Sequence, residues 1–501
     1  MKIVSGKIMS QIDQKSQENF GIPSILLMES AGTSALRILL KEAWNNVLPH
    51  GRFVFLCGKG NNGGDAMVMA REILSMGKMD LAIILVAGAP KNDSPAMTNL
   101  EICKKLGIQT IDMSNDQVKT EAGLESASVI FDGIFGTGFS GEMQKPIASI
   151  IEKTNRISCI KIAIDNPSGL GESYRSGDII FQAEYTLAMG LPKDCMYFPS
   201  ARPMCGKIMI IPVCFPKTLL ENPAQAGILI THEDIQNYLK PVALHSYKKN
   251  RGHISIFAGT AGLAGAAILA SRAASRSRTG LVTVYTDSSA YASIASQSSS
   301  VMVRDYTTAM PADADIKSTH TAILVGPGFG LLSQQEAIFY RLVKSGLPIV
   351  IDADAITLLT RLLTKEKLRF SSNAIITPHP GELSRLTGLD TSKILENPMP
   401  VLKKTAADLE AFIVLKTHVT FIVSPDGSYY VYDGMNPAMG TGGSGDVLAG
   451  LIAGLLASGL SPLDAACCGV LVHGKAGLQA FKSAGWFVAE DLIPFISNAL
   501  K

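Results

Sequence analysis

Short apolar runs alternate with amphipathic stretches along the first part of the chain. A helical pattern over 24–44 precedes an apolar strand pattern over 52–57, and a Gly-rich turn with a second helical pattern follows. Further strands are predicted at 81–86, 128–132, 161–165, 184–189 and 207–213. Because the early strands alternate with helices, we expect a parallel sheet with crossover helices. The later strands lie closer together, which predicts a less regular far edge.

This alternation stops between residues 215 and 251, so we predict a boundary near residue 225 and two domains, 1–225 and 226–501. A second α/β series begins with a strand at 253–258 and an Ala-rich helix over 263–277. A hairpin is expected around Pro425-Asp426-Gly427, and a long Gly/Ala/Leu helix begins at Asp446. The remaining predicted strands are 281–285, 321–325, 349–352, 373–377, 411–415, 420–424 and 429–432.

The composition is that of a folded α/β protein, with 47% hydrophobic and 18% charged residues. Lys and Arg number 45 against 43 Asp and Glu, and this net charge of +2 does not indicate a nucleic-acid or membrane-surface partner. The segment MKIVSGKIMSQIDQ has no apolar signal region, and no apolar run approaches the ~20 residues of a membrane span. We therefore expect a cytoplasmic protein that acts on small molecules.

A Gly-rich loop, CGKGNNGGD (57–65), lies between a predicted buried strand and a predicted helix. Glycines at such a corner let the backbone approach a ligand, and the helix N-terminus offers N–H groups to an anion. Asn61 and Asn62 add amide oxygens that suit a monovalent cation or a ribose hydroxyl. A turn without a ligand would explain the glycines but not the combination NNGGD, so a binding loop is favoured.

Two more polar loops follow predicted strands of the same sheet, DGIFGTG (132–138) and DNPSG (165–169). Either aspartate alone could cap a turn. In an open parallel sheet, however, ligands bind outside the carboxyl ends of the strands, where the three loops converge. Together they predict a binding site.

The second half of the chain contains NPAMGTGGSGD (436–446), which runs directly into a buried helix. Backbone amides at a helix start stabilise negative charge on a transferred phosphoryl group, and Asp446 is placed to accept the proton of an attacking hydroxyl. An Asp that only caps the helix would not need this density of glycine. The loop lacks the Gly-Lys-Ser/Thr ending of a Walker A motif.

The series NNGGD, DGIFGTG and DNPSG resembles the NAD(P)H-hydrate epimerase domain, which interconverts the R and S epimers of hydrated NAD(P)H. The resemblance implies a Rossmann-like parallel-sheet fold and makes Asp165 the acid/base residue. It implies potassium ligands from Asn62, Asp132 and Ser168. The implied substrate contacts are Asn61, Asn62, Gly63, Gly64, Asp65, Gly136, Thr137, Gly138, Phe139, Ser140, Gly141 and Glu142.

The GSGD loop resembles that of ribokinase-like α/β proteins. HISIFAGT (253–260), GPGFG (326–330), DADA (352–355), TPHPGE (377–382) and LKTHVT (415–420) narrow the resemblance to the ADP/ATP-dependent NAD(P)H-hydrate dehydratase. It implies that Asp446 is catalytic, and that ADP (or ATP) is a co-substrate with Mg²⁺ on its phosphates. Thr417 and Thr279 depart from the family pattern, which has Gly and Ala there. The implied substrate contacts are Ala266, Gly330 and His379, and the implied nucleotide contacts are Lys416, Thr417, His418, Val419, Thr420 and Gly445.

Both resemblances together predict a bifunctional NAD(P)H-hydrate repair enzyme: the N-terminal domain epimerises the hydrates, and the C-terminal domain dehydrates the S form through a phosphorylated intermediate. Ala/Leu-rich helices suggest a homo-oligomer. Two other functions remain open, a ribokinase-like small-molecule kinase and a non-catalytic nucleotide-binding module. We interpret His473, in the apolar segment GVLVHGKAG, as a hydrogen-bonded core histidine.

Overall fold

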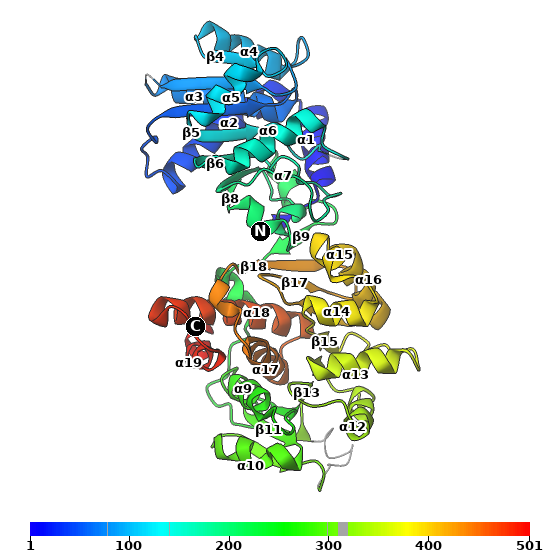
Figure 1. Cartoon of the computed structure of the whole chain (residues 1–501). Coiled ribbons are helices and arrows are strands. Elements are labelled where there is room, and N and C mark those ends of the chain that lie inside the picture. The colour runs from blue at the N-terminus through cyan, green and yellow to red at the C-terminus, as the bar shows by residue number, and fades with distance from the viewer. Residues whose placement is uncertain (78, 140, 298, 309–318) are drawn as a thin grey trace. The chain divides into compact units, whose positions relative to one another are not determined.

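The computed structural model describes residues 1–77, 79–139, 141–297, 299–308 and 319–501. The chain divides into two compact units, Met1–Gly227 and Ile228–Lys501. Each unit is built around one β-sheet with helices on both faces, which confirms the predicted α/β class (Figure 1). No helix within the described ranges is both long and apolar enough to cross a membrane.

The sheet of the N-terminal unit has seven strands in the order β4-β3-β2-β5-β6-β7-β8, and every neighbouring pair is parallel. The strand order therefore reverses between β2 and β5, which is where ligands bind in such sheets. The strands are β2 (Arg52–Cys57), β3 (Asp80–Leu85), β4 (Gln109–Asp112), β5 (Ala127–Gly133), β6 (Ile160–Ile164), β7 (Tyr185–Met189) and β8 (Lys207–Ile211).

The expectation of a less regular far edge is wrong, because β6, β7 and β8 pair in continuous parallel register. They lie close together in the sequence because no α-helix connects them. Two short 3₁₀ helices, η1 (Asp194–Tyr197) and η2 (Arg202–Cys205), stand between β7 and β8 instead. β4 was not predicted from the sequence, because only one of its four side chains, that of Ile111, is buried and its pattern is therefore weakly apolar.

The helices of this unit bury their apolar faces against a sheet that is itself apolar on both sides. In β2 every residue after Arg52 is buried, as expected of a central parallel strand. On one face lie α2, α3 and α4, and on the other α5 and α6. The helices are α1 (Gly6–Phe20), α2 (Ser24–Glu42), α3 (Asn61–Ser75), α4 (Pro95–Lys105), α5 (Gln117–Glu125), α6 (Lys145–Arg156) and α7 (Lys217–Glu221), and a short strand, β1 (Lys2–Ile3), precedes them.

The sheet of the C-terminal unit contains a run of strands in the order β9-β18-β17-β16-β15-β14-β13-β10-β11-β12. The pairs β16/β17 and β17/β18 are antiparallel, which confirms the hairpin expected around Pro425-Asp426-Gly427. The strands are β9 (Gly227–Leu229), β10 (His253–Phe257), β11 (Leu281–Thr286), β12 (Met302–Asp305), β13 (Ala322–Val325), β14 (Ile349–Ile351), β15 (Ala374–Ile376), β16 (Phe412–Leu415), β17 (Val419–Val423) and β18 (Tyr429–Asp433).

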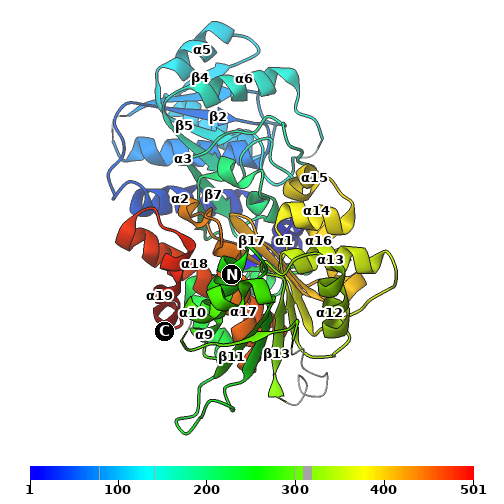
Figure 2. The ribbon, with the colours of Figure 1, turned by 60° about the horizontal axis from the view of Figure 1, so that its bottom comes forward.

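One helix, α17 (Ser444–Ala457), is central to the packing of this unit. Every residue from Val447 to Ala457 is buried, since α17 packs between the sheet and α9, α18 and α19 (Figure 2). An all-round apolar helix of this length is a core helix. The other helices are η3 (His232–Asp234), α8 (Ile235–Tyr238), α9 (Ala264–Ser275), α10 (Ser288–Gln297), α12 (Ser333–Val343), α13 (Asp354–Leu363), α14 (Pro380–Thr387), α15 (Thr391–Glu396), α16 (Met399–Leu409), η4 (Pro437–Met439), α18 (Pro462–Ala484) and α19 (Ala489–Ala499).

Candidate active sites

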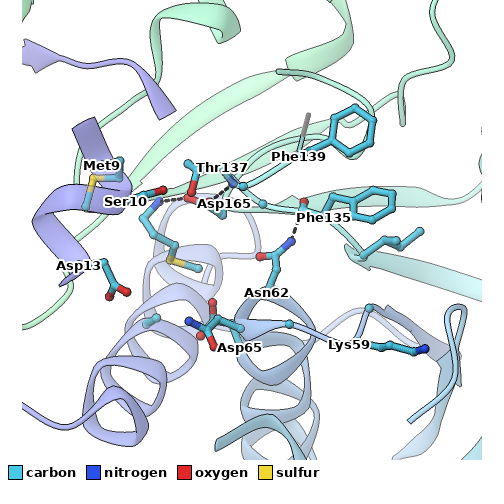
Figure 3. Close-up of a pocket in the computed structure, with 18 of the residues that line it drawn as sticks. Met9, Ser10, Asp13, Lys59, Asn62, Asp65, Phe135, Thr137, Phe139 and Asp165 are labelled. Carbon is cyan, nitrogen blue, oxygen red and sulfur yellow. Dashed lines mark hydrogen bonds between the residues drawn. The ribbon is translucent and has the colours of Figure 1, made fainter. Parts of the chain in front are cut away.

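A cavity of about 760 Å³ opens at the carboxyl edge of the N-terminal sheet, beside the point where the strand order reverses. Its walls come from α1, from the loop between β2 and α3, and from the loop after β5 (Figure 3). Asp165, the first residue after β6, also lines it. The predicted residues that line it are Asn61, Asn62, Asp65, Gly136, Thr137, Gly138, Phe139, Glu142 and Asp165.

Gly63 and Gly64 do not line this cavity and instead allow close packing around the loop. A Cβ on Gly63 would lie 2.1 Å from the carbonyl oxygen of Gly58, and one on Gly64 would lie 2.4 Å from Cε of Met28. Gly141 is exposed outside the lining, and Ser140 lies outside the described residues. The glycines of NNGGD thus set the shape of the loop, while the side chains of Asn62 and Asp65 face the ligand space.

Asp165 is held in place by its backbone conformation and by two hydrogen bonds to its carboxylate. Its backbone has φ +65°, a left-handed conformation uncommon outside glycine. Its Oδ2 accepts a hydrogen bond from the Thr137 N–H at 3.0 Å, and its Oδ1 accepts one from the ammonium of Lys193. Lys193 is entirely buried and also donates to the Met189 carbonyl at 3.1 Å. The sequence analysis missed this lysine, whose only signal was a charge within the apolar stretch MGLPK.

Two further carboxylates face the same cavity, Asp65 on α3 and Asp13 on α1. Burial raises the pKa of Asp65 well above its usual value, and the charges of Asp165 and Asp13 raise it further. The pKa of Asp13 is also raised, mainly by burial. The raised pKa favours the protonated form of Asp65, which lines the same cavity as the Asp165 carboxylate that is paired with Lys193.

The three side chains expected to bind potassium are joined through the peptide of Phe135. The Asn62 amide donates to the Phe135 carbonyl at 2.8 Å, and the Phe135 N–H donates to Ser168 Oγ at 2.9 Å. Ser168 in turn donates to Asp132 Oδ1 at 2.6 Å. Within the described part of the chain, Asn62 Oδ1 is buried and accepts no hydrogen bond. A buried free amide oxygen beside a buried carboxylate is a donor set that fits a potassium ion.

Burial also shifts the pKa of Asp132, one of the three expected potassium ligands. The pKa of Asp132 is raised to about 6 by burial, against which the hydrogen bonds from Ser168 and Ile134 act. A nearby cation would favour the ionised carboxylate.

In the C-terminal unit, Asp446 stands in the first turn of α17. Burial and the charges of Asp352, Glu382 and Asp354 raise its pKa to about 7, while Lys416 opposes the rise. Lys416 forms an ion pair with the buried Asp352 at 2.5 Å, and Thr377 Oγ1 donates to the same carboxylate oxygen at 2.7 Å. A carboxylate with a pKa near 7 beside a lysine suits general-base catalysis.

A second cavity, of about 700 Å³, lies between the β16–β17 loop, the end of β18, the start of α17 and the middle of α18. Thr417 keeps its hydroxyl within its own loop, since it accepts the Val419 N–H at 3.1 Å. Val419 itself is a buried strand residue outside the lining. The predicted nucleotide residues that line the cavity are Lys416, Thr417, His418, Thr420 and Gly445.

His473 also lines this cavity, and the interpretation of it as a hydrogen-bonded core histidine is wrong in part. It is buried, but its Nε2 has no hydrogen-bond partner in the described ranges. Burial lowers the pKa of His473 to about 4, so the ring is neutral.

The three expected substrate residues of this unit lie outside the second cavity, and two of them, Gly330 and His379, contact acidic residues whose charges raise the pKa of Asp446. The Gly330 N–H donates to Asp354 at 2.8 Å, and His379 caps α14 in a reciprocal pair with Glu382. Ala266 lies in α9 next to Gly328: a Cβ on Gly328 would lie 3.3 Å from the Cβ of Ala266.

Two family models match the chain. One, described as YjeF-related protein N-terminus, matches residues 24–195, and the other, described as NAD(P)H-hydrate dehydratase, matches residues 254–498. The bifunctional NAD(P)H-hydrate repair enzyme Nnr of Moorella thermoacetica is 32% identical over 100% of this chain and 97% of its own length.

Solved structures resemble the C-terminal unit. A ribokinase-like superfamily protein of Enterococcus faecalis is 26% identical, with a TM-score of 0.50, over 55% of this chain and 95% of that one. An ADP/ATP-dependent NAD(P)H-hydrate dehydratase of Bacillus subtilis, co-crystallised with ATP and Mg²⁺, is 26% identical with a TM-score of 0.48, over 55% of this chain and 97% of that one.

Proposed function

This chain belongs to the family of bifunctional NAD(P)H-hydrate repair enzymes, and we propose that its N-terminal unit is the epimerase and its C-terminal unit the dehydratase. One observation carries this assignment of sites. Each unit has a buried carboxylate–lysine ion pair at the carboxyl edge of its sheet, Asp165 with Lys193 and Asp352 with Lys416.

Epimerisation requires water to leave the hydrated ring carbon and to add again from the other side. We infer that Asp165, fixed by its ion pair with Lys193, takes the proton of the incoming water. Asp65 lines the same cavity, and because burial raises its pKa it is suited to protonate the departing hydroxyl. Proton transfer by a positioned carboxyl group is worth about 10²–10⁴-fold in rate.

Potassium is part of this proposal, with Asn62, Asp132 and Ser168 as its side-chain ligands. The ion would supply positive charge beside the substrate and hold the loops after β2, β5 and β6 together. The support is the free buried oxygen of Asn62. Replacing K⁺ by Li⁺ in the assay should then slow epimerisation, since the smaller ion cannot span the same ligands.

In the C-terminal unit, Asp446 accepts the proton of the substrate hydroxyl as that oxygen attacks the terminal phosphate of ADP or ATP and AMP or ADP leaves. Loss of the phosphate, together with a proton from the neighbouring ring carbon, then restores the ring double bond of NAD(P)H. The α17 N-terminus offers backbone amides to the phosphates, and Lys416 lies near it, since a Cβ on Gly445 would come within 3.6 Å of Nζ. Mg²⁺ would bind with the nucleotide phosphates. The second cavity would take the rest of the nucleotide.

We further propose a cytoplasmic homo-oligomer. All eight cysteines are free thiols, as is usual in a reducing compartment. Exposed apolar side chains at the α18–α19 corner, Trp486 and Val488 among them, support an interface between copies. Light scattering coupled to size exclusion measures the oligomeric state.

Recovery of NADH absorbance from a mixture of both hydrate epimers, with Mg²⁺ and ADP or ATP, tests the proposed function. Wild type should recover the whole mixture, and Asp446→Asn none of it. If recovery of NADH stops at the fraction of the mixture that is the S epimer, the N-terminal unit does not epimerise the hydrates and the epimerase assignment fails. A stable phosphorylated product would favour a small-molecule kinase, and nucleotide binding without turnover a binding module.

A further inference from the structure

Lys59 occupies an exposed position in the loop between β2 and α3 and lines the N-terminal cavity. Its side chain runs toward Gly88, which follows β3: a Cβ on Gly88 would lie 3.6 Å from Lys59 Cε and 3.9 Å from Nζ. In Figure 3 it extends away from Asp65 and Asp165. The ammonium therefore lies beside the carboxyl end of β3, far from the proposed proton-transfer residues.

At the end of β3 the cavity lining carries the positive charge of Lys59. Lys59 forms no ion pair within the part of the chain that the structure describes. The segment that follows β3, VAGAPK (86–91), contains no acidic residue; its Ala87 lines the cavity, whereas Lys91 does not. Of the four carboxylates that line the cavity, Asp13, Asp65 and Asp165 come from α1, α3 and the end of β6, and Glu142 comes from the loop between β5 and α6.

The order of the strands indicates which part of a bound dinucleotide would lie at this end of the cavity. Counted from β2 along the chain, the order β4-β3-β2-β5-β6 is 3-2-1-4-5, the order of dinucleotide-binding sheets. In those sheets the end of the second strand meets the adenosine ribose: an acidic residue there binds the free 2′-hydroxyl, and a basic residue accommodates a 2′-phosphate. Here the second strand is β3, its end has no acid, and Lys59 reaches it.

From this arrangement, and resting on the proposed epimerase function, we infer that Lys59 binds the 2′-phosphate of the substrate's adenosine ribose, so that the N-terminal unit prefers NADPH hydrate to NADH hydrate. The adenosine half of the dinucleotide lies over β2 and β3, and the hydrated nicotinamide ring lies at Asp165 after β6. The ligand thus crosses the point where the strand order reverses, and Lys59 and Asp165 mark its two ends.

The test measures epimerisation of separate NADPH and NADH hydrates, without ADP or ATP, so that the dehydratase does not turn over. A charge-assisted hydrogen bond contributes about tenfold or more in affinity. Wild type should therefore show a kcat/KM for NADPH hydrate about tenfold or more above that for NADH hydrate. Lys59→Gln should bring the ratio close to one by lowering the NADPH-hydrate value, and adenosine 2′,5′-bisphosphate should inhibit wild type more strongly than Lys59→Gln.

Lys105 is an exposed lysine at the end of α4, outside the cavity. Lys105→Gln is therefore the matched control for loss of one positive charge, and it should keep the wild-type ratio of the two kcat/KM values. Equal rates on both hydrates in wild type, or an unchanged ratio in Lys59→Gln, would overturn the inference and leave the epimerase assignment standing. Loss of the preference for NADPH hydrate to the same degree in Lys105→Gln would also overturn the inference, since the effect would then come from the overall charge of the protein. Absence of epimerisation of either hydrate would remove the proposed function and this inference with it.

Discussion

Replacing the proposed base Asp446 with asparagine should stabilise the C-terminal unit while it abolishes dehydration. The pKa of Asp446 rises from its usual 3.8 to about 7 in the folded unit, through burial and the charges of Asp352, Glu382 and Asp354. Folding therefore works against ionisation of this side chain. Asparagine has nearly the same shape and carries no charge at any pH, so it avoids this cost.

The size and pH dependence of the effect follow from proton linkage. Between pH 3.8 and about 7 the folded unit binds a proton at Asp446 that the unfolded chain has lost, so wild-type stability falls as pH rises through this window. At about 1.4 kcal/mol for each pH unit, a pKa of about 7 in place of 3.8 corresponds to at most about 4 kcal/mol. The stability advantage of Asp446→Asn should be near zero below pH 4, grow up to about pH 7 and stay constant above it.

Calorimetric melting of the full chain between pH 5 and pH 8.5 measures this difference. The transition of the C-terminal unit is the one that added ADP or ATP raises. The Asn variant should melt at a higher temperature than wild type at pH 8 and show a smaller advantage at pH 5. Equal melting at pH 8, or a less stable variant, would refute the reasoning that burial and neighbouring charges hold the pKa of Asp446 high.

Three further changes test other contacts. Lys193→Met leaves Asp165 buried without its cation, so it should lower the free energy of unfolding of the N-terminal unit by about 3–5 kcal/mol in denaturant titration, and Asp165→Asn/Lys193→Met should recover part of the loss. Gly136→Ala would place a Cβ 2.9 Å from Asp165 Oδ2 and should reduce the epimerisation rate at least tenfold, whereas Gly123→Ala, whose Cβ would make ordinary contacts with Ile84 at 3.7 Å and Ile111 at 3.8 Å, should not. Glu382→Gln removes a charge that raises the pKa of Asp446, so the rise of dehydratase kcat/KM with pH should move to lower pH, and an unmoved profile would contradict the assignment of Asp446 as base.

Patterns local in the sequence predicted most of the fold and much of the candidate sites. The strand 52–57 and the helix from 24 were evident because consecutive apolar residues are buried together. The loops NNGGD, DGIFGTG and DNPSG could be placed at one edge because all parallel strands point the same way. Asp165 and Asn62 were singled out in this way, since each lies where a strand ends or a helix begins, whereas Lys416 was named only through the family resemblance.

The remainder depended on contacts between distant segments, which no local pattern reveals. Lys193 meets Asp165 across 28 residues, and Asp352 meets Lys416 across 64. Asp13 belongs to a helix that the sequence analysis did not anticipate, although α1 forms one wall of the cavity. His473 was interpreted from its apolar neighbours along α18, but it lines the second cavity because α18 packs against the start of α17.

Complementation between two inactive variants tests the central claim, two separate active sites on one chain, most directly. Pure R hydrate, Mg²⁺ and ADP or ATP are given to Asp165→Asn, to Asp446→Asn and to an equal mixture of both, and NADH absorbance is followed. Asp165→Asn should recover NADH only as fast as the R hydrate epimerises spontaneously, and Asp446→Asn should recover none. The mixture should recover all of it at a catalysed rate. Recovery by Asp165→Asn alone at the wild-type rate, or none by the mixture, would contradict the account.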